Sequence, residues 1–389
     1  MYPARLFFTL PVLLILVFAA GCKHEPSPTG IDLLPGSDLA GLETFDSRDL
    51  GIPARVSTYL QPTAGATAAF LPLGRTADYN SRILLRWLGW PSDIGDKGRI
   101  ISATVTLYRA PYSFGETSAP FAFEARAVQK NWSSYTFTSD SLANLTVDAT
   151  PAGSFSGTMK DSIQFQIDST TVRSWLRLMN GQNFTEIFGL LLEAAPGINA
   201  IHTFDSFESG NNTPILRLVM SLDGSTDTTF SASALEDTFV ATGPAPLVTS
   251  LAVHGALSWR GTVAFDLSAI PPGSIVNSAT LRLTIDPSRY RKNIRGIDSV
   301  RVYELADSAK RTPGSEYTIS MPDSTNRIKA SGYAMYRLVQ RWVNHPEQNH
   351  GFMIVKVEEI GDMDLLAFYG SDAAPEQRPR LTVTYTRKP

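Results

Sequence analysis

Residues 102–108 read SATVTLY, and residues 278–285 read SATLRLTI. In both stretches apolar residues alternate with polar ones, which is the pattern of a β-strand with one buried face. The two stretches share their first three residues although they lie far apart in the chain. We infer that one structural unit occurs twice.

Matches elsewhere in the chain extend this repeat in the same order. They pair residues 82–87 with 260–265, 124–128 with 299–303, Trp175 with Trp342, 189–192 with 351–354, and 214–218 with 379–383. Collinear matches of differing composition indicate a duplicated module. Because most of these segments read as short strands separated by Pro/Gly turns such as residues 270–274, we predict an all-β chain of two tandem antiparallel β-sandwich domains, jelly-roll-like in kind.

Each copy also contains one segment with helical periodicity. The apolar residues that would form one stripe at positions i, i+3, i+4 and i+7 are Val172, Trp175, Leu176 and Met179 in the first copy and Met335, Leu338, Val339 and Trp342 in the second. This spacing predicts a short amphipathic helix in each sandwich. We expect Asp168 or Ser169 to cap the first helix, Gly181 to end it, and each tryptophan to plug a core.

The start of the chain has the features of a bacterial lipoprotein. Residues 6–20 are almost entirely apolar, follow Arg5, and precede Gly21 and Cys22. This arrangement predicts a removable signal peptide over residues 1–21. Small residues before Cys22 resemble a lipobox, and Cys22 is the only cysteine, so we expect a lipid on Cys22 that anchors the chain to a membrane. The residue after Cys22 is Lys23 rather than Asp, which resembles the pattern of lipoproteins that are sorted to the outer membrane.

The boundaries that follow from these patterns divide the chain into an anchor and two modules. Residues 22–46 would form the lipidated N-terminus and a spacer rich in Pro and Gly. The first sandwich would cover residues 47–222 and the second residues 227–389. The polar stretch between them would be the joint.

Composition and motifs argue against a nucleic-acid-binding protein and against an enzyme. The 34 Lys and Arg residues nearly balance 37 Asp and Glu residues, so no basic field for nucleic acid is expected. Neither a Gly-x-Ser-x-Gly elbow nor a phosphate-binding glycine loop occurs. We therefore predict a protein that is not an enzyme. His345 and His350 lie five residues apart in a loop, which is either a solvated loop or a weak metal site.

The order of the matched segments resembles that of the DNRLRE domain, a secreted β-sandwich related to carbohydrate-binding module family 96. The resemblance rests on residues 82–87, 102–108, Trp132, Trp175 and 204–206, and it recurs in the second copy. The eponymous string is absent, and residues 80–84 are its nearest counterpart. The resemblance implies attachment or recognition at the cell surface, in some members through glycans, and it specifies no ligand.

Aromatic residues near loops are the candidates for stacking on sugar rings. They are Trp90, Tyr112, Phe114 and Trp132 in the first copy and Trp259 and Tyr290 in the second. The alternative is that they cover the edges of the sandwiches.

The acidic stretch 358–364 is the candidate for calcium, since it clusters oxygen ligands around a glycine. Glu359, Asp362 and Asp364 would be the ligands. The alternative is a solvated hairpin, and no other cofactor is expected. The counterpart in the first copy, residues 194–199, has no carboxylate, so the site would belong to one copy.

These features favour a lipid-anchored protein of the outer membrane or cell surface that binds or organises extracellular material. Polysaccharide is the expected ligand. A structural or assembly role with a surface protein partner is the alternative, supported by β-strand edges that could pair with another chain.

Overall fold

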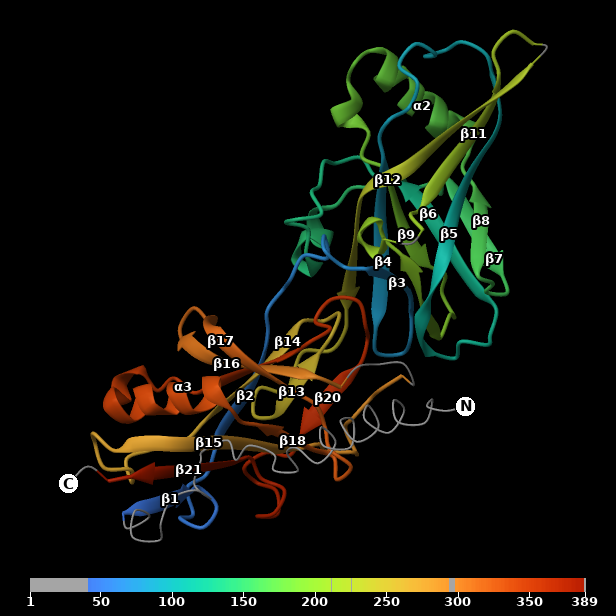
Figure 1. The fold of residues 1–389 in the computed structure, drawn as a ribbon. Helices are drawn as coiled ribbons and strands as arrows, with labels where there is room; N and C mark the ends of the chain where they lie inside the picture. The colour runs from blue at the N-terminus through green and yellow to red at the C-terminus, as the bar shows by residue number, and fades with distance from the viewer. Residues whose placement is uncertain (1–40, 211, 225, 294–297, 388–389) are drawn as a thin grey trace, which may run out of the picture.

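The computed structural model describes residues 41–210, 212–224, 226–293 and 298–387, which form two lobes placed end to end (Figure 1). Every pairing between strands in these residues is antiparallel, and each lobe is a β-sandwich with one α-helix. The predicted all-β class is confirmed. Cys22 and the signal segment lie outside the described residues. No helix within the described ranges is long and apolar enough to cross a membrane.

The first sandwich uses the middle of the chain. Its strands are β3 (Phe70–Arg75), β4 (Asn80–Trp87), β5 (Arg99–Gly115), β6 (Phe121–Ala127), β7 (Gly153–Gly157), β8 (Ser162–Gln166), β9 (Leu190–Ala194), β10 (Ala200–Asp205), β11 (Ile215–Ser221) and β12 (Asp227–Thr242). One face has the order β12-β11-β5-β8, and the other has the order β10-β3-β4-β9-β6-β7. The long strands β5 and β12 take part in both faces.

The second sandwich combines the start of the described chain with its C-terminal part. Its strands are β1 (Leu42–Asp46), β2 (Arg55–Leu60), β13 (Leu251–His254), β14 (Trp259–Ala264), β15 (Ile275–Thr284), β16 (Val300–Asp307), β17 (Thr312–Ser320), β18 (Arg327–Ala330), β19 (Phe352–Lys356), β20 (Leu365–Phe368) and β21 (Arg380–Thr386). One face has the order β1-β21-β15-β18, and the other has the order β17-β16-β19-β14-β13-β20, with β2 on β14. Strand for strand, this is the order of the first sandwich.

The two sandwiches exchange their leading strands. Strands β1 and β2 precede the first sandwich in sequence, yet β1 pairs with β21 and β2 pairs with β14. Strand β12 precedes the second sandwich, yet it pairs with β11 and β4. In Figure 1, blue β1 and β2 therefore lie among the gold and red strands, and olive β12 lies in the green and cyan lobe. The modules expected at residues 47–222 and 227–389 are thus crossed by strands in both directions.

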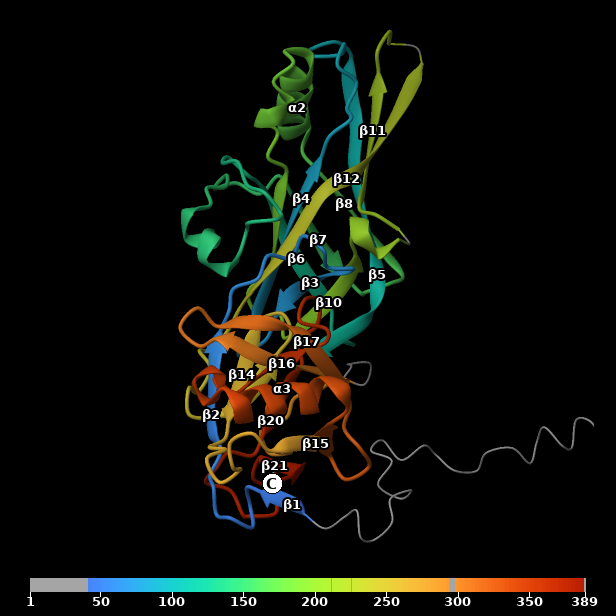
Figure 2. The same ribbon diagram turned by 60° about the vertical axis from the view of Figure 1, so that its left-hand side comes forward.

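The two helices occupy equivalent positions and match the predicted spans. Helix α2 (Ser169–Asn180) is capped by Asp168, whose carboxylate accepts hydrogen bonds from the backbone N–H groups of Thr170 and Thr171, and Gly181 ends it. Helix α3 (Tyr333–Asn344) buries its apolar stripe, including Trp342. Figures 1 and 2 both place α2 at the end of the first sandwich that is remote from the second. The short 3₁₀ helices are η2 (Ser139–Asn144), η3 (Phe184–Glu186), η4 (Phe207–Ser209) and η5 (Pro346–Gln348).

The junction between the sandwiches is apolar and continuous with the first core. Leu257, Trp259 and Met363 of the second sandwich belong to the hydrophobic cluster that fills the first. The His254 ring packs 5.1 Å from the ring of Tyr79, centroid to centroid. A shared core of this kind favours a fixed relation between the two lobes, because separating them would expose apolar surface.

Candidate functional site

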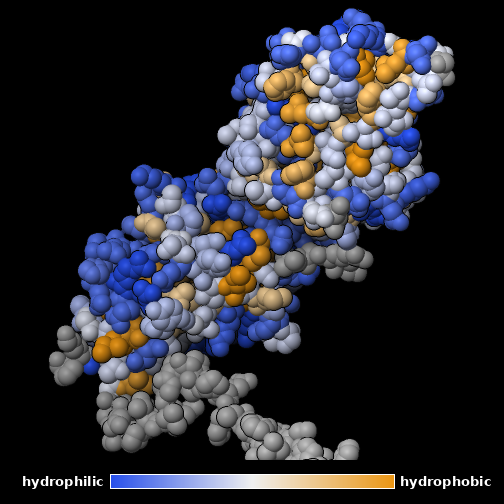
Figure 3. All heavy atoms as spheres, turned by 45° about the horizontal axis from the view of Figure 1, so that its top comes forward, coloured by the Kyte–Doolittle hydropathy of each residue, from blue (hydrophilic) through white to orange (hydrophobic). Residues whose placement is uncertain are grey.

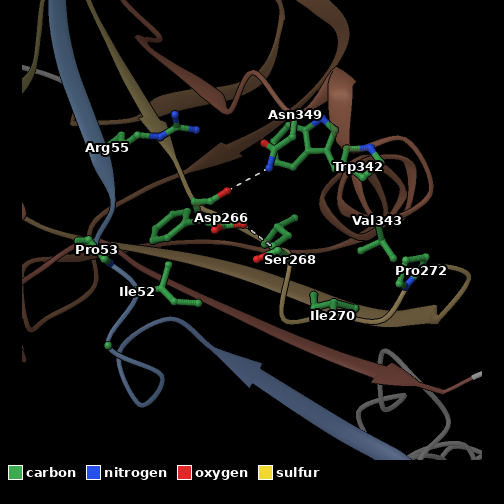
Figure 4. A pocket seen from close by; sticks show the side chains of 14 residues that line it. Ile52, Pro53, Arg55, Asp266, Ser268, Ile270, Pro272, Trp342, Val343 and Asn349 are labelled. Carbon is green, nitrogen blue, oxygen red and sulfur yellow. Dashed lines mark hydrogen bonds between the residues drawn. The ribbon is translucent and has the colours of Figure 1, made fainter.

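A pocket lies beside α3 at the end of the second sandwich. Its volume is about 760 Å³, within the range of small-molecule sites. Its lining comprises Gly51, Ile52, Pro53, Arg55, Phe265, Asp266, Leu267, Ser268, Ile270, Pro272, Trp342, Val343, Pro346 and Asn349 (Figure 4). On the face of the molecule that Figure 3 shows, hydrophobic residues form only small groups that are separated by hydrophilic residues.

Three segments build this pocket. The exchanged strands contribute residues 51–55, which connect β1 to β2. The turn after β14 contributes residues 265–272, with Phe265 and Leu267 buried and Asp266 and Ser268 exposed. The end of α3 and the loop after it contribute Trp342 and Asn349. The pocket therefore exists only because the N-terminal strands join the second sandwich.

Two residues that line the pocket each have a buried polar atom without a hydrogen-bond partner within the described chain. These atoms are the indole Nε1 of Trp342, which can only donate, and the amide Oδ1 of Asn349, which can only accept. The Asn349 amide nitrogen donates to the carbonyl oxygen of Phe265 at 3.0 Å, which sets the orientation of the amide group. Figure 4 shows the two side chains next to each other. Such atoms call for water or a ligand, because leaving them unpaired costs free energy.

The rim of the pocket carries opposite charges. Arg55 and Asp266 both line it, and the Asp266 carboxylate accepts a hydrogen bond from the backbone N–H of Ser268 at 2.9 Å. The hydrogen bonds from Ser268 lower the pKa of Asp266. Asp266 therefore stays ionised at neutral pH and can accept hydrogen bonds from a ligand.

A second hollow adjoins the pocket. It measures about 430 Å³ and shares Arg55 and Asn349 with the first, and it is also lined by Tyr59, Arg311 and His350. The hydroxyl of Tyr59 is buried without a partner in the described chain, and the Arg311 guanidinium lies 4.4 Å from the centroid of the Tyr59 ring. The shared residues make one continuous surface that could receive a chain-like ligand.

The first sandwich is built differently at the corresponding place. There, Trp90 packs against Trp175 of α2, with ring centroids 6.3 Å apart, and donates its indole N–H to the Trp87 carbonyl oxygen at 3.1 Å. A hollow of about 610 Å³ beside α2 has no unpartnered buried side-chain atom in its lining. The duplicated modules therefore differ at this end.

The predicted aromatic binding residues are not brought together. Four of the six are at most 7% exposed: Trp90, Tyr112, Trp132 and Trp259. Phe114 packs on Tyr79, and the Tyr290 hydroxyl donates to Asp298 at 2.7 Å. For these four buried residues the prediction of an exposed stacking surface is corrected, since apolar rings gain more free energy by joining the cores and the junction. For Phe114 and Tyr290, which are half-buried, it stays a prediction.

The predicted calcium ligands each have a protein partner instead. Glu359 forms a two-pronged ion pair with Arg260, Asp362 pairs with Lys356, and Asp364 accepts a hydrogen bond from the Tyr112 hydroxyl at 2.7 Å. No group of three metal-ligating side chains occurs in the described ranges. The acidic stretch is therefore a docking loop against the first sandwich, and the prediction of a solvated or calcium-binding hairpin is corrected.

Sequence reasoning missed Arg55, Asp266 and Asn349. Arg55 belongs to the first module by sequence, so nothing local could place it beside α3. Asp266 directly follows the matched segment 260–265, and Trp342 was visible as a core residue. The unpartnered indole nitrogen has no signature in the sequence.

Comparisons with known proteins leave the family open. The chain matches no family model, and no curated protein sequence matches it. A solved structure from Parabacteroides distasonis, described as a candidate secreted protein, aligns over 86% of this chain and 99% of its own at 11% identity, with a TM-score of 0.19. A likeness of that size carries no argument. The resemblance to DNRLRE domains stays a prediction from sequence motifs.

Proposed function

We propose that this chain is a lipid-anchored, non-catalytic protein of the outer membrane or cell surface, and that its second sandwich binds a polysaccharide in the pocket beside α3. The observation that carries the proposal is the pair of unpartnered polar atoms, Trp342 Nε1 and Asn349 Oδ1, on two residues that line a cavity of about 760 Å³.

The chemistry of the pocket suits a ligand rich in hydroxyl groups. A hydroxyl can accept a hydrogen bond from the Trp342 indole and donate one to the Asn349 amide oxygen, so one sugar hydroxyl could satisfy both atoms. Apolar surface from Ile52, Pro53 and Pro272, which are half-buried or exposed, can pack against the C–H groups of a sugar ring. The charged rim and the adjoining hollow would contact further units of the chain.

The predicted lipid anchor on Cys22 supports the proposed location at the outer membrane or cell surface. The apolar segment 6–20 before Cys22 is the feature on which surface display rests, and a sequence without a Gly-x-Ser-x-Gly elbow or a phosphate-binding glycine loop supports a binding role.

Binding of the full chain in detergent to a broad glycan array, followed by calorimetry with the best ligand, tests the proposal. We expect Trp342→Phe to weaken binding by about fivefold, because it removes one hydrogen bond worth about 1 kcal/mol and keeps an aromatic ring. Trp132→Phe is the matched control, since this buried tryptophan donates to Phe188 in the first sandwich, and its affinity should be unchanged.

Two results would overturn the proposal. One is the absence of saccharide binding by folded protein, which would favour the structural or assembly role. The other is an equal loss of affinity in both variants, which would place the ligand away from the α3 pocket.

A further inference from the structure

A lysine and two aspartates lie together at the junction, shielded from solvent. Lys356 is the last residue of β19. After Val357, the docking loop, residues 358–364, leads to β20. The exposed fractions of Lys356 and Asp364 are 0%, and that of Asp362 is 5%. The Lys356 ammonium forms an ion pair with the carboxylate of Asp362. Side chains of these types are rarely buried so completely.

Burial favours the uncharged form of both carboxyl groups in this cluster. Burial raises the pKa of Asp362 to about 7 and also raises the pKa of Asp364. Burial and the nearby Lys356 lower the pKa of His254 to about 3, so the imidazole is neutral. Tyr112 and Asp298 are the other titratable groups that act on Asp364. Transfer of one proton from the Lys356 ammonium to the Asp362 carboxylate across this contact gives an uncharged amine beside an uncharged carboxylic acid, and it removes two charges from the buried site.

The hydrogen bonds at the cluster hold the Asp362 carboxyl group for attack. The backbone N–H of Asp364 donates to Asp362 Oδ1 at 3.2 Å, where it can stabilise negative charge on that oxygen. Asp364 Oδ1 accepts hydrogen bonds from the Tyr112 hydroxyl and from the backbone N–H of Asn293. Asp364 Oδ2 is buried and has no partner in the described chain, so it is free to carry a proton.

We propose that Lys356 and Asp362 become joined by an intramolecular amide bond. The neutral Lys356 Nζ attacks Cγ of the protonated Asp362 side chain, and a bond forms between Nζ and Cγ. The nitrogen loses a proton to the Asp364 carboxylate, which returns it to the departing hydroxyl. The Cγ–O bond breaks, one water leaves, and the amide remains, so no oxidant or other reactant is needed.

Burial of the two charged groups favours formation of the amide. An ion pair in a low-dielectric interior bears the desolvation cost of two charges, whereas an amide bears none of it. The product also closes residues 356–362 into a ring. That ring would hold Met363 and Asp364 against the first sandwich and fix the junction covalently.

Peptide mass spectrometry on the full chain tests the proposal, because an ion pair disappears on denaturation and an amide does not. Trypsin should fail to cleave after Lys356, and the peptide that spans residues 356 and 362 should be lighter than expected by one water. A protease that cleaves after glutamate then cuts at Glu358 or Glu359, between the two linked residues. The two halves should stay joined.

Halves that separate after this second cleavage would overturn the proposal, even if the peptide had lost water, because cyclisation of Asp362 onto its own backbone also releases water. Peptides of full mass that trypsin cleaves after Lys356 would overturn it as well, and would leave an ordinary buried ion pair.

Three variants sharpen the result. Lys356→Gln should give separable halves. Asp362→Asn should give halves that remain joined and lack one ammonia, because the leaving group changes. Asp364→Asn should slow the appearance of the linked peptide in a time course after cell-free synthesis of the chain, and a wild-type rate would remove Asp364 from the proton transfer.

Discussion

Asp237 is an acidic side chain that is buried in the first sandwich. It lies in β12, is 3% exposed, and accepts one hydrogen bond, from the backbone N–H of Phe207 at 2.8 Å. Its other carboxylate oxygen is buried without a partner in the described chain. Burial raises the pKa of Asp237 to about 7, and the nearby charges of Glu208 and Glu236 act in the same direction.

This shift predicts a pH dependence of stability. Between pH of about 4 and about 7 the folded chain keeps the proton on Asp237 while the unfolded chain loses it, so the free energy of unfolding should fall as pH rises through this window. Asp237→Asn should flatten the fall, measured by urea unfolding at several pH values. Asp140→Asn, at an exposed site, is the control and should run parallel to the wild type. A profile for Asp237→Asn as steep as that of the wild type would contradict the assignment.

Single residues were also where sequence reasoning failed most clearly. An aromatic residue near a predicted loop looks the same in sequence whether it faces solvent or a neighbouring module. Tyr112 and Trp259 lie at the junction, which has no local signature because it depends on both modules. Trp342 was placed correctly in the core of the second sandwich, since helical spacing is a local property.

At the level of elements, local periodicity and the repeat predicted ten of the 21 described strands and both helices, but they could not predict which sheet each strand joins. The leading strands pair in the same way in both copies. Phe45 of β1 lies opposite Val383, as Phe230 of β12 lies opposite Leu218. A strand whose pattern fits either sheet can join its own module or the other, and the long-range choice is invisible in the local sequence.

The exchange predicts which sandwich each leading strand stabilises. Phe45 is 2% exposed in the core of the second sandwich, and Phe239 is 4% exposed in the core of the first. Phe45→Ala should cost about 3–5 kcal/mol and reduce hydrogen-exchange protection in β21 and β15. Phe239→Ala should cost a similar amount and reduce protection in β4 instead.

The two variants serve as controls for each other. Loss of protection in β4 for Phe45→Ala, with β21 unchanged, would show that each module keeps its own leading strand.

At the scale of the whole molecule, the exchange reverses the order of the sandwiches relative to the N-terminus. The chain passes through the second sandwich as β1 and β2, crosses to the first over residues 61–69, and returns over residues 243–250. Two connections and a shared core therefore hold the lobes together. If Cys22 carries the lipid, the C-terminal sandwich is the one attached to the spacer.

This order predicts that the second sandwich lies nearer the membrane than the first. The spacer from Cys22 to β1 reaches at most about 70 Å when fully extended, at about 3.5 Å per residue, and the first sandwich lies beyond the second along the long axis of the molecule (Figure 2). Fluorophores on Leu50→Cys, in the loop after β1, and on Thr170→Cys, at the start of α2, compare the two lobes in liposomes. We expect quenchers in the lipid to act more strongly at residue 50, because the spacer joins the second sandwich first. Stronger quenching at residue 170 would contradict this orientation, and would mean that the lobe with the α3 pocket faces away from the membrane.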